Sequence, residues 1–242
     1  MSASPLRTPS VAVTSRRLAL IGLTSVGVLA LGMVAAAIAY RGETGESYSP
    51  LNHFISELGE IAVSRLAWAF NLGVVLGGSG LGLFVLVLAQ RLGGRFRIAL
   101  RLAGLAAGIF GAMVGIFPMD YHATHRIVSD LFFLSGWFVP AIFSAWLLAT
   151  PRPRFPRWLL APGAVVVAVF LTFIAIYSTY RPASPDGPVV GRPAVFWSVA
   201  FFEWASLVSI MVWLVCVSFV LLREPAEQAR PTEHGSRILQ SE

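Results

Sequence analysis

Apolar residues dominate six long stretches of the chain, and polar residues gather between them. The stretches are Leu18–Ala39, Leu66–Ala89, Leu102–Met119, Ile127–Ala149, Trp158–Ser178 and Ala194–Leu222. Each is long enough for an α-helix to cross a hydrocarbon core about 30 Å thick. None shows the strict apolar/polar alternation of a membrane β-barrel strand. The pattern predicts an all-α integral membrane protein with six transmembrane helices in one domain, residues 16–222.

The two ends of the chain differ from this domain. Residues 1–15 and 223–242 are rich in Ser, Pro, Glu and Arg, a composition that predicts disordered tails. Ala37-Ile38-Ala39 follows an apolar run and a basic start, as at a signal-peptide cleavage site. The run exceeds the roughly 7–15 residues of a signal peptide. We therefore expect a retained first helix, with cleavage before Tyr40 as the alternative.

Composition supports the membrane class. The chain is 56% hydrophobic and only 12% charged, whereas soluble domains carry about 25% charged residues. Every basic residue is Arg, and these lie in short clusters rather than in a stripe with interleaved aromatics. We therefore expect membrane lipids, and no nucleic acid, as partners. Cys216 is the only cysteine, which excludes an intrachain disulfide and a Cys-based zinc site.

The Arg residues also predict the orientation. The tails and alternate loops on one side hold 13 of the 18 Arg and carry a net charge of +9, and the other side carries −3. Cytoplasmic loops are enriched in Arg and Lys. Both termini are therefore predicted to be cytoplasmic, in a multi-pass protein of the cell membrane.

Small residues and one proline predict how the helices pack. Glycines recur at four-residue spacing in Gly73/Gly77, Gly104/Gly108 and Gly111/Gly115, which lets helices approach closely in lipid. We expect contact between the second and third spans, with a homodimer through these faces as the alternative. Pro140 lies within the fourth span, where it is expected to kink the helix.

The stretch "YSPLNHFISELGE", residues 48–60, is the most unusual part of the chain. Ser49-Pro50 is a favourable helix start. From there His53, Ser56, Glu57 and Glu60 have the spacing of one helical face. We expect a short amphipathic helix in the first outer loop, at the membrane interface or re-entrant.

Other polar residues are predicted to lie on the same side. Asp130 and Glu203 fall in the outer parts of spans four and six, and ionisable residues inside a span are functional candidates. A salt bridge from Asp130 to Arg126, and a headgroup-level position for Glu203, are the structural alternatives. The candidate pocket comprises His53, Ser56, Glu57, Asp120, His122, His125, Asp130 and Glu203.

Several functions compete for this pocket. The leading hypothesis is binding of a lipid headgroup or small polar solute, without established catalysis. The alternative is a metal-dependent lipid hydrolase, in which Asp120, His122 and His125 bind a divalent metal such as zinc and Glu57 is the general base. A Ser56/His/acid hydrolase lacks a nucleophile-elbow motif. A transporter is disfavoured because no repeat of three plus three spans is visible.

These residues also carry a family resemblance. "NHFISELGE", the following "FNLGVVLGG" and the later "GIFPMD" resemble the domain-of-unknown-function 998 family of prokaryotic multi-pass membrane proteins, over roughly residues 15–222. The matching positions are Ile55, Ser56, Glu57, Leu58, Gly59, Pro118 and Asp120. The resemblance implies six helices and an unassigned activity. A fainter similarity to the six-pass Frag1, DRAM and Sfk1 proteins points toward lipid handling, by analogy of fold alone.

Overall fold

Six helical spans make up the computed structural model, which describes residues 14–42, 44–179 and 195–224. Within these ranges six helices are long and apolar enough to cross a membrane, and no strand is formed. The predicted fold class is therefore confirmed, and the chain is a multi-pass membrane protein. The predicted tails lie almost wholly outside the described residues.

Seven α-helices and four 3-10 helices follow one another along the described part of the chain. The α-helices are α1 (Ser15–Ala39), α2 (Ala67–Leu88), α3 (Gly94–Ile116), α4 (His122–Gly136), α5 (Phe138–Ala149), α6 (Leu160–Thr179) and α7 (Ser198–Leu222). The 3-10 helices are η1 (Ile55–Gly59), η2 (Ala89–Arg91), η3 (Met119–Tyr121) and η4 (Arg157–Leu159). The helices α4 and α5 together form the fourth span.

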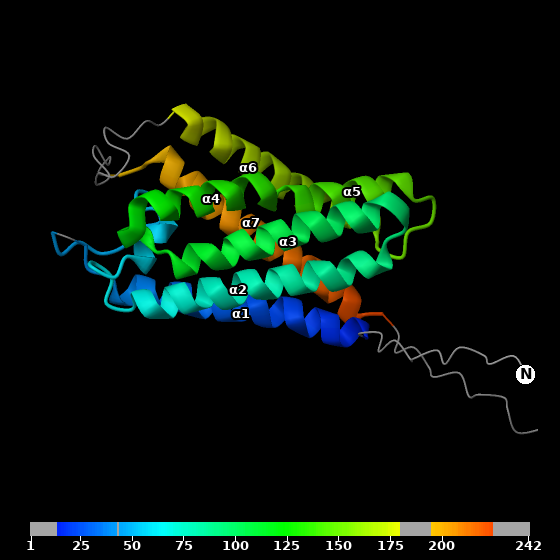
Figure 1. Ribbon diagram of the computed structural model, residues 1–242, viewed down its shortest axis with the longest axis horizontal. Helices are drawn as coiled ribbons and strands as arrows, with labels where there is room; N and C mark the ends of the chain where they lie inside the picture. Colours follow the sequence, from blue (N-terminus) through cyan, green and yellow to red (C-terminus); the bar gives the residue numbers. More distant parts are fainter. Residues whose placement is uncertain (1–13, 43, 180–194, 225–242) are drawn as a thin grey trace, which may run out of the picture.

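The spans form one bundle with α1, α2 and α3 side by side and α7 packed against α1 and α6 (Figure 1). The first residue of α1 lies close to the last turn of α7. The Ser15 hydroxyl donates a hydrogen bond to the carboxylate of Glu224, just after α7. Arg91 Nη1 also lies 2.9 Å from Glu224 Oε2. Both described ends of the chain thus share one end of the bundle. That this end is cytoplasmic stays a prediction.

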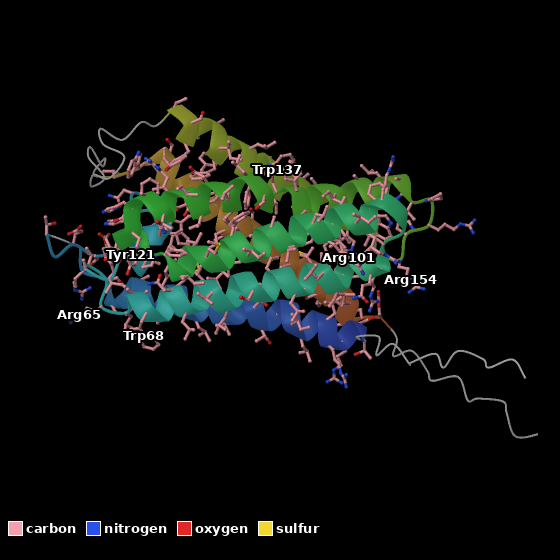
Figure 2. All side chains as sticks on the ribbon, viewed as in Figure 1. Arg65, Trp68, Arg101, Tyr121, Trp137 and Arg154 are labelled. Atoms are coloured by element: carbon pink, nitrogen blue, oxygen red, sulfur yellow. The ribbon has the colours of Figure 1, made fainter. Side chains whose placement is uncertain are left out.

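Charged and aromatic side chains mark the two ends of the bundle. Arg65 and Tyr121 lie at one end, whereas Arg101 and Arg154 lie toward the other (Figure 2). Between them, the lateral surface exposes large apolar side chains such as Leu31 and Ile38, which are 72% and 73% exposed. Such a surface is compatible with lipid as the surrounding solvent.

The fourth span is interrupted, as Pro140 predicts. The break between α4 and α5 falls at Trp137, three residues before Pro140. Proline lacks an N–H, and its ring clashes with the carbonyl four residues earlier, here that of Gly136. The helix is interrupted at Trp137 and restarts at Phe138.

Glycines set the closest helix contacts. A methyl group on Gly108 of α3 would lie 2.5 Å from the Gly82 Cα of α2, so these backbones touch. Gly73 and Gly77 face Val28 and Leu29 of α1 instead. The predicted contact of spans two and three is therefore present, and the glycines of α3 make it. The pair Gly73/Gly77 of α2 packs against α1 instead. A homodimer stays a prediction.

Gly108→Ala is expected to destabilise the bundle by about 1–3 kcal/mol, because the added methyl separates α2 from α3. Gly27→Ala on α1 is the matched control, since nothing lies within 4 Å of its added methyl. The thermal unfolding midpoint in detergent should fall for the first variant only. Equal midpoints for both variants would contradict the close α2–α3 contact.

Candidate functional site

Residues 48–62 fold back into one end of the bundle and are here called the plug. The expected amphipathic helix from Ser49 is not what forms. Residues 49–53 make a turn, and the 3-10 helix η1 begins only at Ile55. Every residue from 53 to 59 is buried, apolar and polar alike. Residues 53–59 are therefore enclosed by the protein, whereas Leu51 and Ile61 near the two ends of the plug are exposed.

Glu203 of α7 holds the plug from inside the bundle. Its Oε2 accepts the Ile55 N–H at 2.7 Å. Glu203 is only 6% exposed. The carboxylate is therefore enclosed by protein and accepts a hydrogen bond from the plug backbone, whereas its depth in the membrane stays a prediction.

Glu57 makes the equivalent contact from within the plug. Its Oε1 accepts the Phe54 N–H at 2.8 Å, and its Oε2 accepts the Tyr40 hydroxyl at 3.2 Å. The first N–H groups of a helix lack partners in the helix itself. The two glutamates thus satisfy the N–H groups of Phe54 and Ile55, where η1 starts.

Tyr48 ties the plug to α7 a second time. The Trp204 Nε1–H donates to the Tyr48 hydroxyl at 2.7 Å, and that hydroxyl donates to the Phe54 carbonyl at 2.8 Å. Burial, followed by the negative charge of Glu203, raises the pKa of Tyr48. The phenol therefore stays protonated and keeps its role as a donor.

Asp120 fixes the far end of the plug. Its two carboxylate oxygens accept the N–H groups of Ile61 at 2.8 Å and Ala62 at 3.1 Å. Asn71 of α2 donates through Nδ2 to the Gly59 carbonyl at 2.9 Å. The Asp120 carboxylate of the "FPMD" piece thus caps the backbone just after "ISELGE".

His53 is enclosed by aromatic rings rather than pointing into a cavity. Its ring centroid lies 5.5 Å from that of Tyr40 and 5.2 Å from that of Tyr48. Its Nε2 is 3.9 Å from Glu46 Oε1. A hydrogen bond from Thr44, and less strongly the His53 charge, lower the pKa of Glu46. Glu46 is thus a carboxylate at neutral pH beside the His53 ring.

His125 and Ser129 form a pair on α4. The His125 Nδ1 lies 2.7 Å from the Phe117 carbonyl oxygen. Because a carbonyl only accepts, Nδ1 carries the proton and Nε2 of the neutral ring is an acceptor. The Ser129 hydroxyl lies 3.3 Å from this Nε2. One turn of helix thus presents a serine hydroxyl to an oriented imidazole.

The remaining candidates do not join these contacts. His122 is half-exposed at the start of α4. Asp130 is attracted by the Arg126 charge, but the two form no direct ion pair among the described residues. In the same part of the chain, no three His, Cys, Asp or Glu side chains are grouped to hold a metal ion. Asp120, His122 and His125 are not arranged as one ligand set here.

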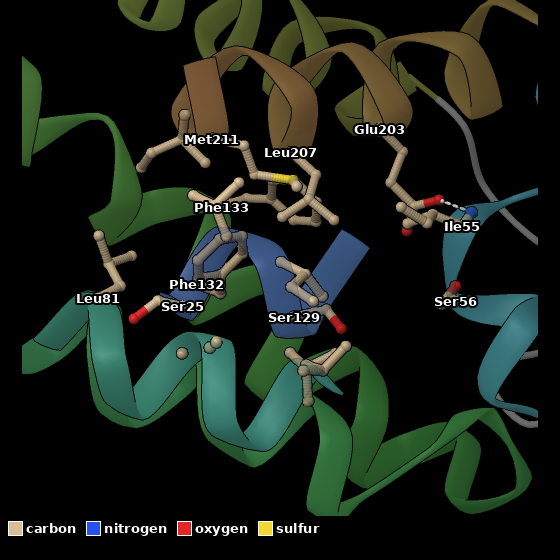
Figure 3. Close-up of a pocket in the computed structure, with 18 of the residues that line it drawn as sticks. Ser25, Ile55, Ser56, Leu81, Ser129, Phe132, Phe133, Glu203, Leu207 and Met211 are labelled. Atoms are coloured by element: carbon tan, nitrogen blue, oxygen red, sulfur yellow. Dashed lines mark hydrogen bonds between the residues drawn. The ribbon is translucent and has the colours of Figure 1, made fainter. Parts of the chain in front are cut away.

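A narrow cavity of about 80 Å³ lies directly beneath the plug. Figure 3 shows Ile55, Ser56, Ser129 and Glu203 at one end of it, with Leu81 and Met211 farther along. The lining residues from α2 and α7 share one spacing: Phe70, Val74, Gly77, Gly78 and Leu81, and Glu203, Leu207, Ile210, Met211 and Leu214. From Glu203 to Leu214 the cavity extends along about 16 Å of helix axis.

The cavity wall is polar at the plug end and almost wholly apolar beyond it. Its polar side chains, among the described residues, are Ser25, Ser56, Ser129 and Glu203. The Ser25 hydroxyl already donates to the Ile21 carbonyl at 2.7 Å. The Ser56 hydroxyl donates to the thioether of Met119, a weak acceptor, at 3.2 Å.

Sequence reasoning missed several residues that complete this end of the bundle. Tyr40, Tyr48 and Trp204 make three of its hydrogen bonds, yet aromatic residues near span ends are more often belt residues. Ser129 had a usable signal, since it follows His125 by four residues on a helix. The residues of α2 and α7 that line the cavity have the same spacing, which is visible in the sequence. Helices that pack in any protein interior have this spacing, so it does not indicate a cavity.

Glu203→Leu is expected to release the plug locally, because the buried Ile55 N–H loses its acceptor at a cost of about 1–3 kcal/mol. Amide hydrogen exchange of plug peptides should become about tenfold to a hundredfold faster. Asp130→Leu is the control, since Asp130 makes no described contact with the plug. Unchanged exchange in the Glu203 variant would show that this carboxylate does not anchor the plug.

Comparison with known proteins supports the resemblance carried by the plug and the Asp120 loop. A family model described as "Protein of unknown function (DUF998)" matches residues 10–220. No curated protein and no solved structure matches the chain, and the fainter similarity to the Frag1, DRAM and Sfk1 proteins is not supported. The match covers most of the sequence and all six spans except the last two residues of the sixth. The chain belongs to the DUF998 family of proteins of unknown function.

Proposed function

We propose that this protein binds a single-chain amphiphile in the cavity beneath the plug, with the polar group of the ligand at Ser56, Ser129 and Glu203. The proposal places the site in the outer leaflet of a prokaryotic cell membrane, as the Arg distribution and the family resemblance favour. The observation that carries it is the division of the cavity wall into one polar end and a long apolar remainder.

The shape of the cavity supports a hydrocarbon chain rather than a small polar solute. A buried water typically needs two to four polar partners, and beyond the plug end the wall offers Ser25 alone, whose hydroxyl is already bonded to Ile21. Apolar lining with a few polar groups at one end is typical of sites for amphiphilic ligands. A volume of about 80 Å³ favours one chain over two.

The polar end favours a ligand group that donates hydrogen bonds. The Glu203 carboxylate accepts the Ile55 N–H through Oε2, and a carboxylate has about four acceptor positions over its two oxygens. The hydroxyls of Ser56 and Ser129 both donate and accept. A hydroxyl-bearing headgroup such as glycerol, which both donates and accepts hydrogen bonds, would meet these groups.

Leu207→Trp is expected to weaken binding of a long-chain 1-O-alkylglycerol ether at least about tenfold, because the indole fills the apolar part of the cavity. The ether is chosen because it cannot be hydrolysed. Val208→Trp is the matched control, since Val208 is the next residue of α7 and is 43% exposed on the outer face. Binding is measured with the radiolabelled ether and protein in detergent micelles.

Equal binding by wild type and the Leu207 variant would overturn the proposal, since the ligand would then lie outside the cavity. Displacement of the ether by free glycerol at similar concentrations would instead favour a small polar solute. Binding lost only in the Leu207 variant, and insensitive to free glycerol, is the predicted result.

A further inference from the structure

We infer that Ser129 is a nucleophile and His125 its general base, and that the cavity accepts the acyl chain of a lipid ester whose carbonyl carbon Ser129 attacks. This inference rests on the proposed amphiphile site and adds a reaction to it. Neither the family description nor the leading sequence hypothesis assigns Ser129 a role.

The geometry of α4 supplies the nucleophile and its activation. The Phe117 carbonyl, 2.7 Å from His125 Nδ1, fixes the ring so that Nε2 lacks a proton. The Ser129 hydroxyl is 3.3 Å from that Nε2, a distance typical of a loosely formed serine–histidine pair without bound substrate. A backbone carbonyl here orients the imidazole, a role that a carboxylate fills in many serine hydrolases.

Access to substrate follows from the position of Ser129 in the cavity wall. Ser129 lines the polar end, and Phe132 and Phe133, one turn farther along α4, line the apolar part. Ser129 therefore lies at the boundary between the two. In a lipid ester the carbonyl group is also the junction between the apolar chain and the polar head, so a chain seated in the cavity brings that carbon to Ser129.

The reaction balances with water as the only co-reactant. Ser129 Oγ bonds to the acyl carbon as its proton passes to His125 Nε2, and that proton then goes to the departing alcohol oxygen as the ester C–O bond breaks. A water then attacks the acyl–Ser129 ester and gives a proton to His125. The acid departs, and Ser129 regains its proton from His125.

The test uses an alkyl fluorophosphonate, which phosphonylates serines activated by a base. Wild-type protein in detergent is expected to react at Ser129, located by peptide mass spectrometry. Ser129→Ala should lose that adduct, and His125→Gln should form it at least about tenfold more slowly, corresponding to about 1.4 kcal/mol. Ser135→Ala is the control, because the Ser135 hydroxyl on the same helix donates to the Leu131 carbonyl instead.

A second measurement keeps the inference testable if the Ser129→Ala or His125→Gln variant misfolds. The thiol introduced by Ser129→Cys should react with iodoacetamide at least about tenfold faster when His125 is present than with His125→Gln added. Reaction that is independent of His125, or an adduct elsewhere than Ser129, would overturn the inference. If wild-type protein binds the alkylglycerol ether but forms no Ser129 adduct, the inferred reaction is wrong and the proposed binding function is retained. Failure to bind the ether would remove the proposed function itself.

Discussion

The hydrogen bond from the Ile55 N–H to the Glu203 carboxylate is the interaction on which the plug end of this protein depends. A buried backbone N–H without a partner is costly, and more so where lipid replaces water. A 3-10 helix as short as η1 cannot satisfy its own first N–H groups. Glu203 from α7 and Glu57 from the plug accept the bonds of Ile55 and Phe54, so irregular backbone can enter the end of a helical bundle.

This arrangement changes the interpretation of the acidic residues. Glu57 and Asp120 bind backbone N–H groups and the Tyr40 hydroxyl, so in the described structure both hold the plug in place. At the plug end of the cavity, the polar side chains that line it are those of Ser56, Ser129 and Glu203. The plug thus covers one end of the cavity, and Ser56 of the plug, Ser129 of α4 and Glu203 of α7 together make that end polar.

The fold could be predicted from the sequence because hydrophobic length and proline chemistry act locally. Six apolar stretches correspond to six helical spans, and the break near Pro140 follows from its missing N–H. The plug could not be predicted in the same way. The spacing of His53, Ser56 and Glu57 fits an amphipathic helix, but contacts with Tyr40, Asn71 and Glu203, distant in sequence, favour a buried turn and a 3-10 helix instead. Sequence reasoning grouped the polar residues of this end into one candidate pocket, and that they form a functional site stays a prediction. The contact of the Ser129–His125 pair with the Phe117 carbonyl depends on the fold and has no sequence signal.

A structure of the protein in lipid nanodiscs, determined at a resolution that shows bound lipid, would test the central claim most directly. The account predicts an elongated density between α2 and α7 whose polar end lies beside Glu203 and Ser129, with the plug in place above it and the Ile55 N–H bonded to Glu203. An empty or side-chain-filled cavity, or a plug that lies on the surface with Glu203 turned to solvent, would contradict it.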